Sequence, residues 1–491
     1  MNSPTSISSL RDRQIYTRWL LLAVIGTLMA FSQSAFAQAP VLTPYTPPSN
    51  GIVSEKVDHE LEYTGTATRF SATGLPSGLV LNTKTGRVSG QLNVAGNYHI
   101  VIYAFNGTFK SAPLVIDWIV QPLPAGTVGT YYALIDRHVW YNGGYGGSLR
   151  ITVTGTGAFT GIITRGIHRD SVRGRLETWP GAIDPQGIFT VARRSPYPPL
   201  TVDFGLPLGG NSIYGTLREP NGDVISIDGL KTYTSAGQTP TDYVGRWNTA
   251  YELPGELDGD DDYPQGATWA TQTISRAGVV TWVSRLADGT SNTFSTDLLV
   301  GGETLVHLML YGYAGSVQGW QYFDVENGTT SGSLGWVKSA NYTRSYSGGF
   351  PLHQLSGSGA RYTPPGLNEM IFGITAGTNN ARLLFREGGL GGTFSQVFSL
   401  GARNVISFPT GANPYGIRMS VSLVTGVVTG TGTAMDFNEG QPTNSRSGTF
   451  SALLIPGRQQ AVGHFLLPAS RAGNSQILSG KVIGEENFEN F

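Results

Sequence analysis

Alternation of apolar and polar residues, interrupted by glycine at short intervals, constrains the fold of this chain more than any other feature. The same pattern, two alternating runs around a tight turn that contains glycine, occurs three times, at residues 148–161, 269–282 and 417–430. A period of two places successive side chains on opposite faces of a strand, and glycine supplies the positive φ that tight turns need. Each segment is therefore predicted to be a β-hairpin.

A longer and more apolar hairpin is expected after each of these segments. The expected strand pairs are 200–205 with 212–217, 305–311 with 316–320, and 449–454 with 461–466. Two hairpins per unit, with a closing strand such as 335–337, predict an antiparallel sheet or barrel of five or more strands. The glycine turns of the three copies lie 121 and 148 positions apart, and this irregular spacing favours divergent tandem domains over a solenoid.

The composition supports a folded, β-rich chain. Charged residues make up 13% of it and hydrophobic residues 40%, with 67 glycines and 27 prolines. Disordered chains combine low hydrophobicity with high charge, which is the reverse of this balance. Cysteine is absent, which excludes disulfides, thiol chemistry and thiolate metal sites.

The first 37 residues have the three-part pattern of a secretory signal peptide. Arg11, Arg13 and Arg18 precede an apolar run at 19–31, and the small-residue triplet 35–37 follows it. We expect cleavage after this triplet and export to the cell surface, the periplasm or the medium. An uncleaved anchor is the alternative, but an apolar helix of this length covers only about 20 Å of a hydrocarbon core about 30 Å thick. No later run is long and apolar enough to predict a transmembrane span.

Three short blocks near the N-terminus carry a family resemblance. They are Gly-Leu-Pro-Ser-Gly-Leu at 74–79, Thr-Gly-Arg-Val-Ser-Gly at 85–90 and Ala-Gly-Asn-Tyr at 95–98. Together they resemble the bacterial putative immunoglobulin (cadherin-like) domain over about residues 42–122. The resemblance implies a seven-strand β-sandwich that acts as a spacer or adhesion module. Related cadherin-like domains bind calcium at domain junctions, but the acidic residues here form no recognisable ligand pattern; they are Asp58, Glu60, Glu62 and Asp117.

The remainder of the chain resembles the glycine-rich β-modules of large secreted bacterial surface proteins. The phrases that carry this resemblance are Tyr263-Pro264-Gln265-Gly266 and the segment 286–290. The resemblance implies an architecture and no activity. The predicted class is all-β, an immunoglobulin- and cadherin-like sandwich followed by tandem antiparallel sheet or barrel-like domains. The expected parts are a signal peptide at 1–37, a spacer and sandwich at 38–122, and three glycine-rich β-units at 127–238, 239–350 and 360–491.

An acidic loop is the candidate metal site. Asp258, Asp260 and Asp262 match positions one, three and five of a calcium-binding loop, where carboxylate oxygens converge on one cation. The later requirements fail, because Tyr263 stands where glycine belongs and Trp269 where glutamate belongs. Calcium is thus the one cofactor that the sequence suggests, and a solvated acidic loop is the alternative.

An aromatic loop is the candidate ligand site. Trp140, Tyr141 and Tyr145 could present flat rings to a carbohydrate, with His138 and Asn142 as hydrogen-bond donors. The alternative is that these rings fill the core or cover a sheet edge.

We expect an exported bacterial cell-surface or extracellular protein with a structural or adhesive role. A calcium- or carbohydrate-binding module on a β-scaffold is the alternative, and its partner would be a surface polysaccharide or another surface protein. Catalysis is not expected, because the short signatures for acyl transfer, zinc hydrolysis and dinucleotide binding are absent from the sequence. A secreted enzyme with no recognisable motif is the third alternative. Without residues 1–37 the chain has 29 basic and 32 acidic residues, a net charge of −3 that gives no reason to expect nucleic acid as a partner.

Overall fold

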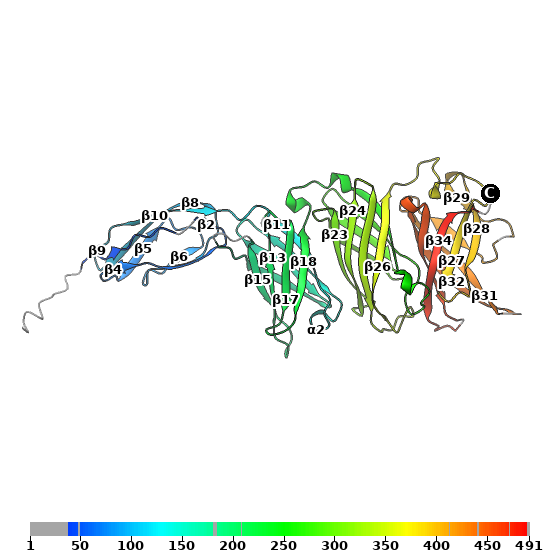
Figure 1. The fold of residues 1–491 in the computed structure, drawn as a ribbon, viewed down its shortest axis with the longest axis horizontal. Coiled ribbons are helices and arrows are strands. Elements are labelled where there is room, and N and C mark those ends of the chain that lie inside the picture. The colour runs from blue at the N-terminus through cyan, green and yellow to red at the C-terminus, as the bar shows by residue number, and fades with distance from the viewer. Residues whose placement is uncertain are drawn as a thin grey trace, which may run out of the picture. The chain divides into compact units, whose positions relative to one another are not determined.

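The computed structural model describes residues 38–47, 50–179, 184–207, 209–411, 413–438, 441–470 and 472–488, without the side chains of 435–438 and 441–444. The predicted signal peptide lies outside these residues. The chain divides into two compact units, one ending at Pro122 and one beginning at Leu123. Both consist almost entirely of antiparallel strands (Figure 1), so the predicted all-β class is confirmed. None of the described helices has the length and apolar character needed to cross a membrane.

The first unit is a small sandwich. Its larger sheet has the order β2 (Gly51–Ile52), β10 (Leu114–Gln121), β8 (Gly96–Asn106) and β5 (Arg69–Thr73), with β9 (Phe109–Lys110) on β8. The other pairings are β3 (Lys56–Glu60), β7 (Arg87–Gln91) and β6 (Leu79–Leu81) in one sheet, and β1 (Val41–Leu42) with β4 (Tyr63–Thr64). The core includes Phe70 of β5 and Ile100 and Ile102 of β8. The structure describes ten strands in this unit, β1 to β10, whereas the resemblance implies seven. Four of the ten have only two residues each.

The second unit contains three sheets of eight strands each. The first sheet comprises β11 (Gly129–Ile135), β12 (Gly147–Val153), β13 (Ala158–Arg165), β14 (His168–Arg175), β15 (Gln186–Val191), β16 (Leu200–Gly205), β17 (Ser212–Arg218) and β18 (Val224–Lys231). The second comprises β19 (Gly245–Glu252), β20 (Thr268–Ile274), β21 (Val279–Arg285), β22 (Ser291–Asp297), β23 (Glu303–Leu310), β24 (Gly315–Asp324), β25 (Thr329–Lys338) and β26 (Phe350–Tyr362). The third comprises β27 (Ala381–Glu387), β28 (Phe394–Gly401), β29 (Val405–Ser407), β30 (Arg418–Val421), β31 (Val427–Asn438), β32 (Gln441–Ile455), β33 (Gln460–Pro468) and β34 (Ile477–Glu486).

Each sheet is an up-and-down barrel with one seam that its ladders leave open. Neighbours in sequence are neighbours in the sheet, and the last strand pairs with the first, so β18 lies against β11, β26 against β19 and β34 against β27. The ladder stops between β14 and β15, between β22 and β23, and between β29 and β30. In the first barrel the bridge between Glu177 and Gln186 holds the two sides of the seam together. All six predicted hairpins are confirmed by these pairings.

The structure corrects one predicted boundary. The second β-unit was expected to end at 350 and the third to begin at 360, but β26 occupies this gap and pairs with both β19 and β25. The run Ser356-Gly357-Ser358-Gly359 has the composition of a linker. Its glycines are needed inside the sheet, because a Cβ at Gly357 would collide with the ring of Tyr251 and one at Gly359 with the backbone of Asn248.

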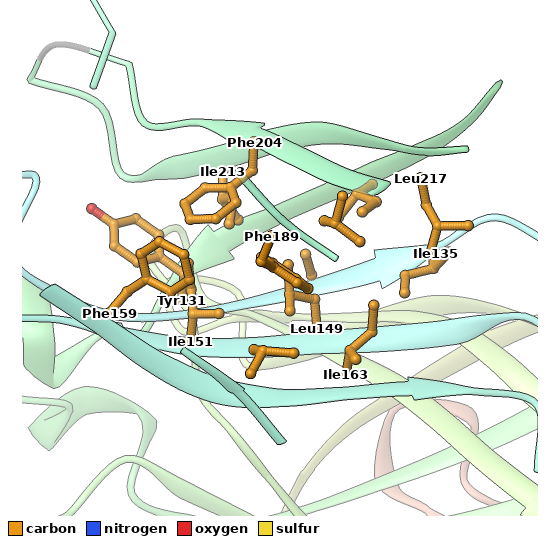
Figure 2. Packing of buried hydrophobic residues seen from close by; sticks show 14 of the residues in the cluster. Tyr131, Ile135, Leu149, Ile151, Phe159, Ile163, Phe189, Phe204, Ile213 and Leu217 are labelled. Carbon is orange, nitrogen blue, oxygen red and sulfur yellow. The ribbon is translucent and has the colours of Figure 1, made fainter. Parts of the chain in front are cut away.

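Aromatic rings and glycines are paired inside the barrels. In the first barrel the ring of Phe159 covers Gly174 on the neighbouring strand, and the ring of Phe204 covers Gly187. Figure 2 shows these two rings with Phe189 and the aliphatic side chains around them. Glycine therefore makes room for a ring in the next strand, and side chains fill the interior of the first barrel.

The second and third barrels contact each other through the outer faces of four strands. Ala250 and Trp269 of the second barrel pack with Leu453, Ile455 and Val462 of the third. The Ala267 N–H donates to the Gly463 carbonyl at 3.0 Å, and Trp269 Nε1 donates to Ser451 Oγ at 3.1 Å. The outward apolar residues of β19, β20, β32 and β33 are thus buried by a neighbouring barrel.

Candidate functional site

A groove on the outer face of the first barrel is the candidate functional site. Its volume is about 390 Å³, and it lies over β15, β16 and β17. The period of two in these strands turns Phe204, Ile213 and Leu217 into the barrel and leaves the residues between them outside. The lining residues are Glu177, Gln186, Gly187, Ile188, Asp203, Phe204, Gly205, Tyr214, Gly215, Thr216 and Arg218.

Tyr214 provides a flat aromatic surface in this groove. It faces Gly205 across the β16–β17 ladder, and a Cβ at Gly205 would lie only 2.6 Å from Tyr214 Cζ, so the ring lies over the glycine. The Tyr214 hydroxyl donates to Asp184 Oδ2 at 2.5 Å, and this hydrogen bond together with partial burial raises the pKa of the phenol. The ring is therefore fixed by its contact with Gly205 and by the hydrogen bond of its hydroxyl to Asp184, and Tyr214 remains 42% exposed.

A polar cluster lies beside the ring. An Arg218 guanidinium nitrogen is 2.7 Å from Asp203 Oδ2, and Thr216 Oγ1 donates to Asp203 Oδ1 at 2.9 Å. The side chains of Arg218 and Asp203 are 42% and 36% exposed. The three side chains fix one another and still present donors and acceptors to the solvent.

The seam of the barrel borders the groove. The Glu177 N–H donates to the Gln186 carbonyl at 2.6 Å, and the Gln186 N–H donates to the Glu177 carbonyl at 2.9 Å. Ile188, just inside β15, and Trp179, two residues after Glu177, are both about half exposed. The groove thus combines an aromatic face, an exposed aliphatic side chain and charged hydrogen-bonding groups, the mixture with which proteins bind polar ligands that also have an apolar face.

A second hollow, of about 490 Å³, lies at one end of the third barrel. It is formed by the segment 362–374 and the β32–β33 turn, and Glu369 is the one charged side chain that lines it. The Glu369 carboxylate accepts the Gly366 N–H at 2.7 Å, so it already serves its own loop. This hollow offers fewer charged side chains to a ligand than the groove on the first barrel, which Glu177, Asp203 and Arg218 line.

The predicted carbohydrate residues are not brought together. Trp140 and Tyr141 lie on α2 (Val139–Asn142), where Trp140 is 75% exposed and Tyr141 only 5%. Tyr141 packs into the first barrel and donates to the Asp223 carbonyl at 2.6 Å. The hydroxyl of Tyr145 lies 2.8 Å from Ser339 Oγ in the second barrel. The helical turn therefore separates Trp140 from Tyr141, and Tyr145, which follows the helix, contacts the second barrel instead of joining them.

The predicted calcium residues lie in a loop that a buried side chain organises. Gln265 Oε1 accepts the Gly259 N–H at 2.9 Å, and Gln265 Nε2 donates to the Asp260 carbonyl at 2.6 Å. Asp260 Oδ1 accepts the Asp262 N–H at 3.0 Å. Within the described ranges, no three His, Asp or Glu side chains, including those of Asp258, Asp260 and Asp262, gather as metal ligands would.

Sequence reasoning missed the residues of the groove. The alternation in 200–205 and 212–218 already separated outward Asp203, Tyr214, Thr216 and Arg218 from their apolar neighbours. What was lacking was the register, because only the pairing of Gly205 with Tyr214 places the ring on the glycine.

Comparisons with known proteins concern the first unit most directly. Residues 29–121 match the family model of the putative Ig domain. This agrees with the resemblance inferred from the sequence blocks at 74–98. No curated protein matches the chain.

Two solved structures are similar to parts of the chain. One is a protein of unknown function of the DUF3598 family from Nostoc punctiforme, with 10% identity, a TM-score of 0.15, and coverage of 48% of this chain and 97% of that one. The other is a double mutant of Transferrin Binding Protein B from Haemophilus parasuis, with 9% identity, a TM-score of 0.16, and coverage of 91% of this chain and 94% of that one.

Proposed function

We propose that this is a surface or extracellular protein that binds polysaccharide through the outer groove of the first barrel, and that this binding gives it an adhesive role. The observation that carries the proposal is the Tyr214 ring, which lies over Gly205 with its hydroxyl fixed by Asp184. The match of the first unit to the Ig domain model supports a spacer in an exported protein. The proposal contains no catalytic step.

The chemistry of the groove suits a sugar. A pyranose ring has an apolar C–H face that stacks on an aromatic ring, and hydroxyls at its rim that need donors and acceptors. Tyr214 provides the first surface, while Asp203 and Arg218 provide acceptors and donors beside it. Because these groups are held by one another, binding would require little further ordering of side chains.

The test is binding of the full chain to a panel of soluble and insoluble polysaccharides. We expect Tyr214→Ala to weaken binding at least about fivefold, since an aromatic contact contributes about 1 kcal/mol beyond its buried area. Tyr214→Phe keeps the ring and loses only the hydrogen bond to Asp184, so it should retain most of the affinity. Tyr342→Ala, at a highly exposed tyrosine of the second barrel, is the matched control. Tyr214→Ala binding as well as wild type, or silence across the whole panel, would refute the proposal.

The exported location has its own test. Cell fractionation should recover the protein at the surface, in the periplasm or in the medium, and shortened by about the length of the predicted leader. A full-length pool confined to the cytoplasm would contradict this part of the proposal.

Binding to another surface protein is a second candidate. Val139 and Trp140 favour it, because two large apolar side chains on one helical turn are mostly exposed. Trp140→Ala should then abolish binding to whole cells and leave binding to purified polysaccharide unchanged.

A further inference from the structure

A row of arginines lies on the outer face of β14. Arg169, Arg173 and Arg175 pair with Thr164, Thr160 and Ala158 of β13, while the residues between them, such as Val172, turn into the barrel. Alternate residues of a strand share a face and rise about 7 Å per pair. Arg173 and Arg175 are therefore about 7 Å apart along the strand, and Arg169 and Arg173 about 13 Å.

The charges of this row are poorly compensated. Arg169 and Arg173 are exposed, and neither side chain has a hydrogen bond or an ion pair to any residue that the structure describes. Arg175 donates to the Thr156 carbonyl at 2.7 Å, which leaves its charge unpaired. The acidic residue of the strand, Asp170, is 2.9 Å from the buried Arg165 and does not serve the row.

The row continues the groove across the seam. The bridge between Glu177 and Gln186 fixes the register of β14 and β15 at one end of the seam. Extending the register of this bridge along the two strands, beyond the point where ladder hydrogen bonds are formed, places Arg175 opposite Ile188, which lines the groove, and Arg173 opposite Thr190. A ligand seated on Tyr214 can therefore extend onto the arginines without leaving the outer face of the barrel.

Protection of a free strand edge does not account for the row. Proteins do place charges on edge strands to prevent aggregation. The other strands that border a seam are β15, β22, β23, β29 and β30, and none of them carries more than one charged residue. The concentration of cations on β14 is thus specific to the strand beside the groove.

We infer that the ligand of the groove is an acidic polysaccharide, whose carboxylate, sulfate or phosphate groups are bound by Arg169, Arg173 and Arg175. This inference rests on the proposed function and specifies its substrate class. The guanidinium fork suits these oxyanions, because it donates two parallel hydrogen bonds to them. Among the acids of the groove, Asp203 is paired with Arg218, whereas Asp184 accepts, within the described part of the chain, only the neutral Tyr214 hydroxyl. We therefore expect the anionic groups of the ligand to lie on the arginine row and not beside Asp184 or Glu177.

The experiment compares polymers that share a backbone. Affinity electrophoresis of the full chain in gels containing dextran, carboxymethyl-dextran or dextran sulfate separates the effect of charge from that of the sugar. The variants are R169Q/R173Q for the row, Y214A for the groove, and R276Q/R418Q as a control at two exposed arginines elsewhere that have no partner among the described residues. Melting curves of all variants check that they are folded.

We expect the two acidic dextrans to bind at least tenfold more tightly than dextran, and this preference to fade as salt is added. R169Q/R173Q should remove the preference, Y214A should weaken binding to all three polymers, and R276Q/R418Q should behave as wild type. Equal binding of neutral and acidic dextrans that is lost only in Y214A would overturn the inference and leave the proposed function standing.

Two other results would count against the proposals differently. Acidic binding that depends on the arginines and not on Tyr214 would exclude the groove as the site and so refute the proposed function. The protein could also bind duplex DNA as tightly as dextran sulfate at the same charge concentration, and R169Q/R173Q could abolish that binding. This result would show a general polyanion site and overturn the inference.

Discussion

Acid should destabilise the contact between the second and third barrels through one buried histidine. His464 on β33 is almost completely buried, and its Nδ1 lies 2.9 Å from the Ala267 carbonyl of the second barrel. Its Nε2 has no hydrogen-bond partner among the residues that the structure describes. Burial lowers the pKa of this imidazole from 6.5 to about 4, with a smaller lowering effect from Arg285, against the opposing effect of the hydrogen bond to Ala267.

The direction and size of the effect follow from linkage. In the unfolded chain the imidazole takes up a proton near pH 6.5, whereas in the folded chain it stays neutral down to about pH 4. Protons therefore favour the unfolded state in this interval, and stability falls as the pH drops through it. The difference between the two pKa values corresponds to about 3 kcal/mol, lost between pH 6.5 and 4.

The assay is urea unfolding at a series of pH values from 7 to 4, followed by tryptophan fluorescence. Trp269 lies in this contact and is one of nine tryptophans, so its emission contributes to the signal that follows unfolding. The variant His464→Asn keeps a donor for the Ala267 carbonyl and cannot titrate. It should be less stable than wild type at pH 7 because it leaves space in the contact, but it should lose about 3 kcal/mol less on acidification. His168→Asn, at an exposed position of β14, is the control.

Parallel pH profiles for wild type and His464→Asn would refute this reasoning. They would mean that the imidazole is hydrated in the folded chain, and hence that the contact is not closed at this point.

Three further substitutions test the packing. Gly187→Ala forces a methyl group into the Phe204 ring and should lower the free energy of unfolding in urea by about 1–3 kcal/mol. Gly155→Ala, where the added methyl group points into open space, should lower it little. Equal effects of the two substitutions would contradict the pairing of glycines with rings. Gln265→Leu removes the hydrogen bonds to Gly259 and Asp260, so it should lower the free energy of unfolding by about 2 kcal/mol and speed proteolysis of the acidic loop. An unchanged rate of proteolysis would show that the Gln265 amide does not organise the loop. Arg403→Gly relieves a positive φ of 58° at an exposed residue and should raise stability by about 1 kcal/mol, and a lower melting temperature would contradict the strain.

Local patterns explain why much of the fold could be predicted. The hairpins at 148–161 and 269–282 are set by turn glycines and alternation within one short window, and both are present as expected. The pairing of β11 with β18 joins residues about a hundred positions apart, and no local signal encodes it. Sequence reasoning therefore reached a sheet or barrel of five or more strands but not the closed order of eight.

The candidate site depended on the same non-local information. Trp140, Tyr141 and Tyr145 are close in sequence, but the helical turn of α2 sends Tyr141 into the core and leaves Trp140 outside. Tyr214 becomes a platform only because the register of β16 and β17 sets it over Gly205. Proximity along the chain was a poor guide to proximity in the barrel wall.

The first and last strands of every barrel are antiparallel neighbours, with Tyr131 opposite Lys231, Arg246 opposite Tyr362 and Ala381 opposite Glu486. The chain thus enters and leaves each barrel at the same rim. Because the first strand of a barrel begins beside the end of its last strand, a whole barrel can be inserted or deleted with a short connector. The strand order of the remaining barrels then stays the same. Tandem duplication could lengthen such a protein one barrel at a time, leaving each copy free to acquire its own surface chemistry.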